Sequence, residues 1–189
     1  EVDYQSELSG KTEKFEEAAR LSRAFSCGAV CGCRTRSRGL LRKSAAVSYR
    51  GKLLGISDMN HVLDGEDFKS GASLGLYQMG GYKVGVCVEN DLYFPESLRA
   101  LSACGCNVVA AVMEQGDGYI PPLLARAYAY LYGVPVVMCA GRTAYFAETS
   151  GELATSCRPV TLFETSPQTG CRLVASRVRG IAEDGRADY

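Results

Sequence analysis

The stretch YKVGVCVENDLYFPE, residues 82–96, has the pattern of a strand, a sharp turn and a helix. Its first half alternates valines with other residues, which is typical of a buried or half-buried strand. Pro95 suits the first turn of a helix, and Glu96 suits the positive N-terminal end of that helix. A strand that stops at a tight turn holds its last side chain at the sheet edge, so we expect chemistry at the end of this strand.

Length and composition set the limits of the interpretation. The 189 residues are enough for one domain with a substantial core, which we place over residues 1–189. Hydrophobic residues make up 47% of the chain without a long apolar run, so we expect a soluble globular protein rather than a membrane protein. The 21 basic and 21 acidic residues cancel, and this balance gives no argument for nucleic acid or a membrane as partner.

The nine cysteines are an odd number, which argues against a complete set of intramolecular disulfides and favours the cytoplasm. Cys-x-Cys spacing on a strand would point two sulfurs to one face, as a zinc site needs. However, no Cys-x-x-Cys pair occurs, and His61 is the only histidine. We therefore expect neither a metal site nor a cofactor.

Patterning on both sides of the central stretch predicts an α/β fold. A basic, solvated loop is expected at 34–39. The other expected elements are helices at 12–25, from Pro95 and at 121–132, and strands at 26–33, 44–49, 52–56, 74–78, 107–113, 134–139, 161–164 and 172–178.

The central stretch resembles the nucleophile strand of the nitrilase superfamily, the carbon–nitrogen hydrolases. Their motif is approximately Lys-Val-Gly-Val-x-Ile-Cys-Tyr-Asp-Leu-Arg-Phe-Pro-Glu. The residues that match it without a gap are Lys83, Val84, Gly85, Val86, Asp91, Leu92, Phe94, Pro95 and Glu96. The family's cysteine falls on Glu89, and Cys87 lies two residues earlier.

The preceding hairpin is also similar to a family motif, Asn-Ser-Ala-x-Val-Ile-x-x-x-Gly-Lys-Val-Leu-Gly. The matching residues are Ser44, Ala45, Val47, Gly51, Lys52, Leu54 and Gly55. In the family this hairpin leads to Tyr-Arg-Lys-x-His-Leu, whose lysine is catalytic. Here Met59 takes the place of the lysine and His61 fits the histidine, while Glu66 begins a segment like the acidic–aromatic–glycine segment that follows.

The resemblance implies an αββα sandwich with mixed sheets, from which the opening strand–helix–strand unit is missing. It also implies a homodimer or higher homo-oligomer through the helices that start at Pro95 and Pro121. Family members hydrolyse nonpeptide carbon–nitrogen bonds with a glutamate base, a lysine and a cysteine nucleophile. Glu7 is the candidate for that glutamate, and the alternative is a chance match.

Substitution of the cysteine and the lysine leads us to expect a non-catalytic binding or scaffolding homologue. The expected binding residues for a small molecule are Met59, His61, Glu66 and Asn90, beside Glu89. Met59 in place of the lysine removes a positive charge, and Glu89 in place of the cysteine adds a negative charge. These two substitutions favour a neutral or cationic ligand.

The alternative function is an active amidase or nitrilase-type hydrolase. In it Cys87 is a shifted nucleophile, or Glu89 activates water. Residues two apart on a strand face one side, so Cys87 is expected beside Glu89, unless it simply fills the core. A third interpretation is a fragment whose missing start supplies the glutamate.

Overall fold

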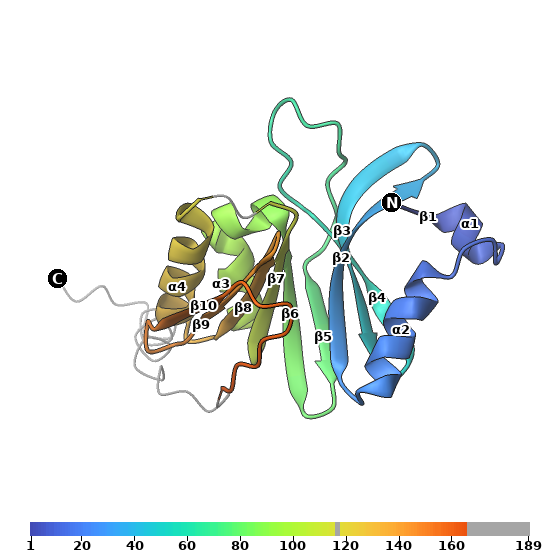
Figure 1. Cartoon of the computed structure of the whole chain (residues 1–189). Coiled ribbons are helices and arrows are strands. Elements are labelled where there is room, and N and C mark those ends of the chain that lie inside the picture. Colours follow the sequence, from blue (N-terminus) through green and yellow to red (C-terminus); the bar gives the residue numbers. More distant parts are fainter. Residues whose placement is uncertain (116–117, 166–189) are drawn as a thin grey trace.

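The computed structural model describes residues 1–115 and 118–165 and contains two β-sheets that pack face to face, with helices on both outer sides (Figure 1). The first sheet has the order β1 (Val2–Asp3), β2 (Gly28–Ser37), β3 (Leu40–Tyr49) and β4 (Lys52–Asp58). The second sheet has the order β10 (Leu153–Ser156), β9 (Thr143–Ala147), β8 (Val136–Ala140), β7 (Val108–Met113), β6 (Tyr82–Val88) and β5 (Gly75–Met79).

Both sheets are mixed. In the first sheet β1 runs parallel to β2, and the other neighbours are antiparallel. In the second sheet β6, β7 and β8 are parallel, whereas β5, β9 and β10 each run antiparallel to their neighbour. The carboxyl ends of β6 and β7 therefore meet at one edge, where the residues that follow them come together.

The helices complete the αββα sandwich that the resemblance implied. Helix α2 (Lys14–Ala24) covers the outer face of the first sheet, after the short helix α1 (Tyr4–Leu8). Helices α3 (Pro95–Ala103) and α4 (Ile120–Tyr132) cover the second sheet, and a 3₁₀ turn, η1 (Glu89–Tyr93), joins β6 to α3. Gly133 ends α4 with a φ of 65°, a left-handed conformation that glycine adopts without strain.

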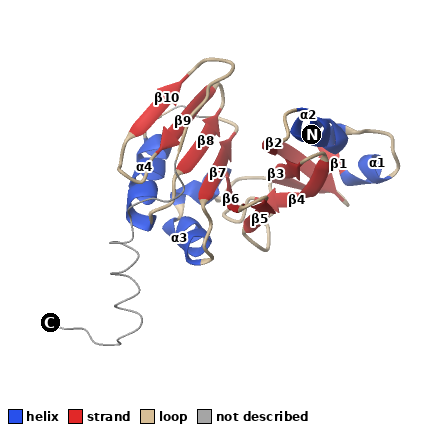
Figure 2. Cartoon of the chain, turned by 90° about the horizontal axis from the view of Figure 1, so that it is seen from below, coloured by secondary structure: helices blue, strands red, loops and turns tan. Residues whose placement is uncertain are grey.

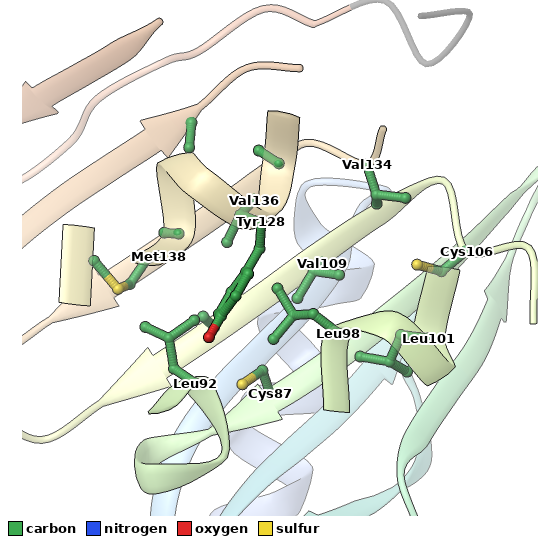
Figure 3. Close-up of a cluster of buried hydrophobic side chains, with 14 of the residues drawn as sticks. Cys87, Leu92, Leu98, Leu101, Cys106, Val109, Tyr128, Val134, Val136 and Met138 are labelled. Carbon is green, nitrogen blue, oxygen red and sulfur yellow. The ribbon is translucent and has the colours of Figure 1, made fainter. Parts of the chain in front are cut away.

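Two clusters of buried side chains hold these layers together. The cluster between the sheets includes Val47, Met59, Val86, Val88 and Val112. The cluster beneath α3 and α4 includes Leu92, Leu98, Leu101, Tyr128 and Met138, and Figure 3 shows it. Strand β6 contributes to both clusters, because its side chains alternate between the two faces of the sheet.

The prediction of a basic loop at 34–39 is wrong. Strand β2 continues to Ser37 and a two-residue turn, Arg38–Gly39, leads directly into β3. Both turn residues have positive φ, 49° and 78°, as the tight turns of β-hairpins require. Thr35 is buried and its hydroxyl lies 2.8 Å from that of Ser44, so this polar part of the strand has partners inside the fold.

The strand expected at 161–164 is also wrong, because the sheet ends with β9 and β10 and residues 161–165 are irregular. The strand expected at 172–178 lies outside the described residues. Helix α2 lies within the range expected for it, and it buries Ala18 and Ser22 while Leu21 and Phe25 are exposed. None of the helices in the described part of the chain has the length and apolar character needed to cross a membrane.

Candidate functional site

Glu89 stands where β6 ends, at the first residue of η1. Its φ is 49°, a left-handed conformation that is uncommon for a residue with a side chain. Such backbone strain costs about 1–3 kcal/mol and is concentrated at functional sites. The turn interrupts the alternation of the strand and directs the Glu89 carboxylate into the space between the sheets.

Two groups from other strands hold this carboxylate. The backbone N–H of Glu114, directly after β7, donates a hydrogen bond to Glu89 Oε1 at 2.5 Å. Lys43 Nζ, from β3, lies 3.9 Å from Glu89 Oε2. The carboxylate thus faces one backbone donor and one cation, although the sequence offered no cation for this place.

Lys43 links Glu89 to Glu66 and Asn90. Lys43 Nζ lies 3.1 Å from Glu66 Oε1, and Asn90 Nδ2 donates to Glu66 Oε2 at 2.7 Å. The backbone N–H of Leu63 also donates to Glu66 Oε2, at 3.0 Å. The structure therefore brings Glu66 and Asn90 to the Glu89 site, with Lys43 between the two carboxylates.

The two carboxylates differ in their pKa. Burial raises the pKa of Glu89 above its ordinary value, although the Glu114 N–H and the charge of Lys43 oppose the shift. Burial alone would also raise the pKa of Glu66, but hydrogen bonds from the Leu63 N–H and from Lys43 outweigh it and lower that pKa. Glu89 is thus the weaker acid of the pair.

His61 lies beside this network and is held by Asp91. The buried Asp91 carboxylate accepts hydrogen bonds from the backbone N–H groups of Asn60 and His61, each at 2.9 Å to Oδ1. His61 Nδ1 lies 2.8 Å from the same oxygen, and the ring stacks on Phe94 with centroids 4.0 Å apart. These contacts tie the loop after β4 to the end of β6, which is a positioning role for His61.

Met59, at the place of the family's lysine, is fully buried between the sheets and packs in the same cluster as Val88. Met59 therefore belongs to the core between the sheets and does not line the cavity described below. Glu7 has a different role from that of a catalytic base. Its carboxylate accepts hydrogen bonds from the backbone N–H groups of Lys14 and Phe15 and so caps α2. Glu7 does not line the cavity described below.

Of the two places expected for Cys87, the structure confirms the core and not a position beside Glu89. Cys87 is 1% exposed and points into the cluster beneath α3 and α4, as Figure 3 shows. Glu89 leaves the strand with positive φ, so the two-residue rule for strands does not extend to it. Burial raises the pKa of the Cys87 thiol well above its ordinary value, which keeps it protonated.

A cavity of about 620 Å³ opens beside Glu89, between β2 and β3 on one side and the ends of β6, β7 and β8 on the other. Its lining residues are Glu1, Val30, Gly32, Cys33, Arg34, Lys43, Ser44, Val88, Glu89, Val112, Met113, Glu114, Cys139 and Gly141. Burial raises the pKa of Cys33 to about 11. Within residues 1–115 and 118–165, no three His, Cys, Asp or Glu side chains are placed to hold a metal ion.

Sequence reasoning missed Lys43 and Glu114, and both had a signal. Lys43 stands where the family hairpin motif has asparagine, directly before Ser44 and Ala45. Glu114 follows β7, and the ends of adjacent parallel strands meet at one sheet edge.

Comparison with known proteins supports the fold. No family profile and no curated protein sequence matches this chain. Among solved structures, an amidase from Nesterenkonia sp. AN1, solved with butyramide, superposes with a TM-score of 0.63 at 17% identity over 74% of this chain. A carbon–nitrogen hydrolase from Helicobacter pylori G27 superposes with a TM-score of 0.65 at 17% identity over 81% of this chain.

The chain has the nitrilase-superfamily fold. It spans 60% of the length of the Nesterenkonia amidase and 66% of the Helicobacter hydrolase. A structure of a mutant of this amidase carries acrylamide added to its active-site cysteine. In the nitrilase fold of this chain, the strand-to-helix turn after β6 presents a carboxylate.

Proposed function

We propose that this chain is a non-catalytic binding or scaffolding homologue of the nitrilase-fold hydrolases, which binds an uncharged or cationic small molecule beside Glu89. It acts as a single domain in the cytoplasm and as a homodimer. The observation that carries the proposal is the Glu89 turn itself. A half-buried carboxylate faces the cavity there, while Cys87 is buried on the opposite face of the sheet.

The charges around the cavity support this ligand class. Arg34 is paired with Glu114, and Glu1 is paired with Arg36. Lys43 lies closer to Glu66, at 3.1 Å, than to Glu89, at 3.9 Å. Glu89 therefore has the least compensated charge in the lining, and a ligand N–H is its natural partner.

The size of the cavity suits a small molecule, because ligand pockets commonly have volumes of roughly 300–1,000 Å³. Valine and methionine side chains form the apolar part of its lining, and the carboxylates and cations lie around the Glu89 turn. An aliphatic amine or amide fits this combination of an apolar wall and a hydrogen-bond acceptor.

The test compares three probes of matched size, propylammonium, propionamide and propionate, by NMR titration of the full chain. We expect the cation and the amide to bind and propionate to leave the spectrum unchanged. Glu89→Gln should weaken the binding of propylammonium by about ten- to a hundredfold, because this is the contribution of a charge-assisted hydrogen bond to affinity. The control is Glu152→Gln, at an exposed position outside the cavity. Binding of propionate alone would overturn the proposal.

A second candidate is hydrolysis of a carbon–nitrogen bond by water that Glu89 activates. The strained turn, the raised pKa of Glu89 and the nearby Lys43 favour it, since a base and a cation are what such a reaction needs. Ammonia release from propionamide would establish it if Glu89→Gln and Lys43→Met abolish the release and Cys87→Ala does not. No release above that of Glu89→Gln would exclude it for this substrate.

A further inference from the structure

The cavity beside Glu89 has walls of opposite charge, and Figure 2 shows the two sheets that carry these walls. The first sheet contributes two cations, Arg34 on β2 and Lys43 on β3. The second sheet contributes two carboxylates, Glu89 directly after β6 and Glu114 directly after β7. A ligand in this cavity therefore meets cations on one side and carboxylates on the other.

On the acidic wall, Glu89 Oε2 is the acceptor that is open to a ligand. Glu89 Oε1 already accepts the hydrogen bond from the backbone N–H of Glu114. No group in residues 1–115 or 118–165 donates a hydrogen bond to Oε2, and Lys43 Nζ, at 3.9 Å, lies beyond hydrogen-bond distance. A ligand ammonium group that enters the cavity finds its acceptor at Oε2.

On the opposite wall, Lys43 has donors to spare. An ammonium group carries three N–H donors, and the acceptor that Lys43 Nζ reaches within the described ranges is Glu66 Oε1, at 3.1 Å. Lys43 Nζ and the guanidinium carbon of Arg34 lie 5.0 Å and 5.9 Å from the centre of the same ring, that of Phe68. Two cations that converge on one aromatic ring favour an anionic group of the ligand at this end of the cavity.

We propose that the Glu89 site takes an α-amino acid as its zwitterion, with the ammonium group on Glu89 Oε2 and the carboxylate on Lys43 Nζ. This inference rests on the proposed function and names the class of its ligand. The spacing comes from the 3.9 Å between Lys43 Nζ and Glu89 Oε2. Hydrogen bonds between charged groups are about 2.7–2.9 Å long, so one molecule bridges the two residues when its own charges lie close together. An ammonium and a carboxylate on one carbon atom meet this condition.

The charges around the cavity favour a carboxylate over a phosphate as the anionic group. Three carboxylates, those of Glu66, Glu89 and Glu114, already lie near the two cations. A phosphate carries nearly two negative charges and would be repelled by them more strongly than a carboxylate. The side chains of Lys43 and Glu89 are only 16% and 14% exposed, so water and salt screen these interactions weakly. The valine side chains of the lining provide an apolar surface for the side chain of the amino acid.

The test compares two isomers with propylammonium by NMR titration of the full chain at pH 7. Both isomers are propylammonium with a carboxylate added. In 2-aminobutyrate the carboxylate is on the carbon that bears the ammonium group, and in 4-aminobutyrate it is at the far end of the chain. We expect the better enantiomer of 2-aminobutyrate to bind about tenfold or more tightly than propylammonium, because it gains a charge-assisted hydrogen bond. We expect 4-aminobutyrate to bind no more tightly than propylammonium.

A variant of Lys43 tests which residue holds the carboxylate. Lys43→Met should bring the affinity of 2-aminobutyrate, relative to that of propylammonium, down to a ratio of about one. The matched control is Lys52→Met, at an exposed position of β4 outside the cavity, and it should keep the wild-type ratio. Because the ratio is measured within each variant, an effect of the substitution on the ammonium site alone cancels.

Three results would overturn the inference: equal affinities of 2-aminobutyrate and propylammonium, an equal gain with 4-aminobutyrate, or a gain that Lys43→Met leaves intact. The proposed function would survive each of them, provided that Glu89→Gln still weakens the binding of propylammonium. If Glu89→Gln leaves the binding of both propylammonium and 2-aminobutyrate unchanged, the proposed function and this inference fail together.

Discussion

Glu89 differs from a typical surface glutamate in both its backbone and its side chain. Its positive φ follows from the abrupt end of β6, and its carboxylate is held by the Glu114 N–H and faced by Lys43. The motif placed the end of β6 and the start of α3 correctly, because the spacing from Lys83 to Pro95 is that of a strand, a turn and a helix. The motif gave no information on the partners, since Lys43 and Glu114 come from other strands.

Glu89→Gln should stabilise the chain in a pH-dependent way. Burial raises the pKa of Glu89 in the folded chain above the ordinary value of 4.5. The folded chain therefore binds this proton more tightly than the unfolded chain, and stability falls as the pH rises from 4.5 through the folded pKa. Glutamine cannot lose a proton, so the variant should have a larger free energy of unfolding than the wild type. This difference should be greatest at pH 7 and should shrink toward pH 4.5. Urea unfolding at several pH values measures it.

The control for this pH series is Glu152→Gln, whose carboxylate is exposed. Its free energy of unfolding relative to the wild type should change little with pH. An advantage of Glu89→Gln that stays constant or grows as the pH is lowered would contradict the raised pKa.

Asp91→Ala should be strongly destabilising. Asp91 is 1% exposed and accepts hydrogen bonds from the backbone N–H groups of Asn60 and His61 and from the His61 ring. Its removal leaves buried donors without an acceptor, at about 1–3 kcal/mol for each such group. Urea unfolding should show this loss, whereas Asp64→Ala, at an exposed loop position, should show almost none. Equal stability of the two variants would contradict the anchoring role of Asp91.

At the scale of elements, β6 and α3 fit together through a glycine. A Cβ added at Gly85 would lie 3.1 Å from Leu101 Cδ1, tighter than ordinary contact, and Leu101 is buried. The absence of a side chain at Gly85 thus lets α3 approach the strand. The family motif predicted this strand and helix, and the structure adds the reason for glycine at this place.

Gly85→Ala should therefore destabilise the chain by about 1–3 kcal/mol through overpacking. Leu101→Ala alone should cost about 2–5 kcal/mol because it leaves a cavity. In the double variant the new methyl enters the space that leucine vacates, so the combined loss should be smaller than the sum. A double-mutant cycle of urea unfolding measures this coupling, and strict additivity would contradict the contact.

Elements were predictable where hydrophobic patterning was strong and unpredictable where polar residues occupy strands. Strands β6 and β7 and helix α4 lie close to their expected ranges, because their apolar residues face a core on regular spacing. The polar end of β2 was expected to be a loop, since the hydroxyl contact of Thr35 with Ser44 and the ion pairs of Arg34 and Arg36 depend on partners distant in sequence. Cys87 was misplaced relative to Glu89 because a local positive φ is invisible to strand periodicity.

At the scale of the whole molecule, α4 presents apolar side chains on the outside of the sandwich. Ile120, Leu123 and Leu131 are 39%, 49% and 48% exposed. A surface of this kind favours self-association. We expect sedimentation analysis to show a homodimer that Leu123→Glu dissociates and that Leu8→Glu, on α1, leaves intact. A wild-type chain that stays monomeric at all concentrations, or a dimer that Leu123→Glu does not affect, would contradict this interface.

The layered architecture was predictable from the resemblance, while the contents of the site were not. Two short motifs, around Ser44 and around Lys83, were enough to imply an αββα sandwich, which matches the layers of the structure. They could not show that Lys43 supplies a cation near Glu89 while Met59 packs into the core, because a substitution at one position does not reveal a replacement that comes from another strand.

The central claim is that the site after β6 is a carboxylate site without a thiol nucleophile. The direct measurement is acrylamide labelling of the native chain, followed by denaturation and mass mapping of each cysteine. Acrylamide adds to the active-site cysteine in a mutant of the Nesterenkonia amidase. We predict labelling of the exposed Cys27, Cys104, Cys139 and Cys157 while Cys87 stays unmodified until the chain is unfolded. Labelling of Cys87 in the native chain as fast as that of Cys157 would contradict the claim.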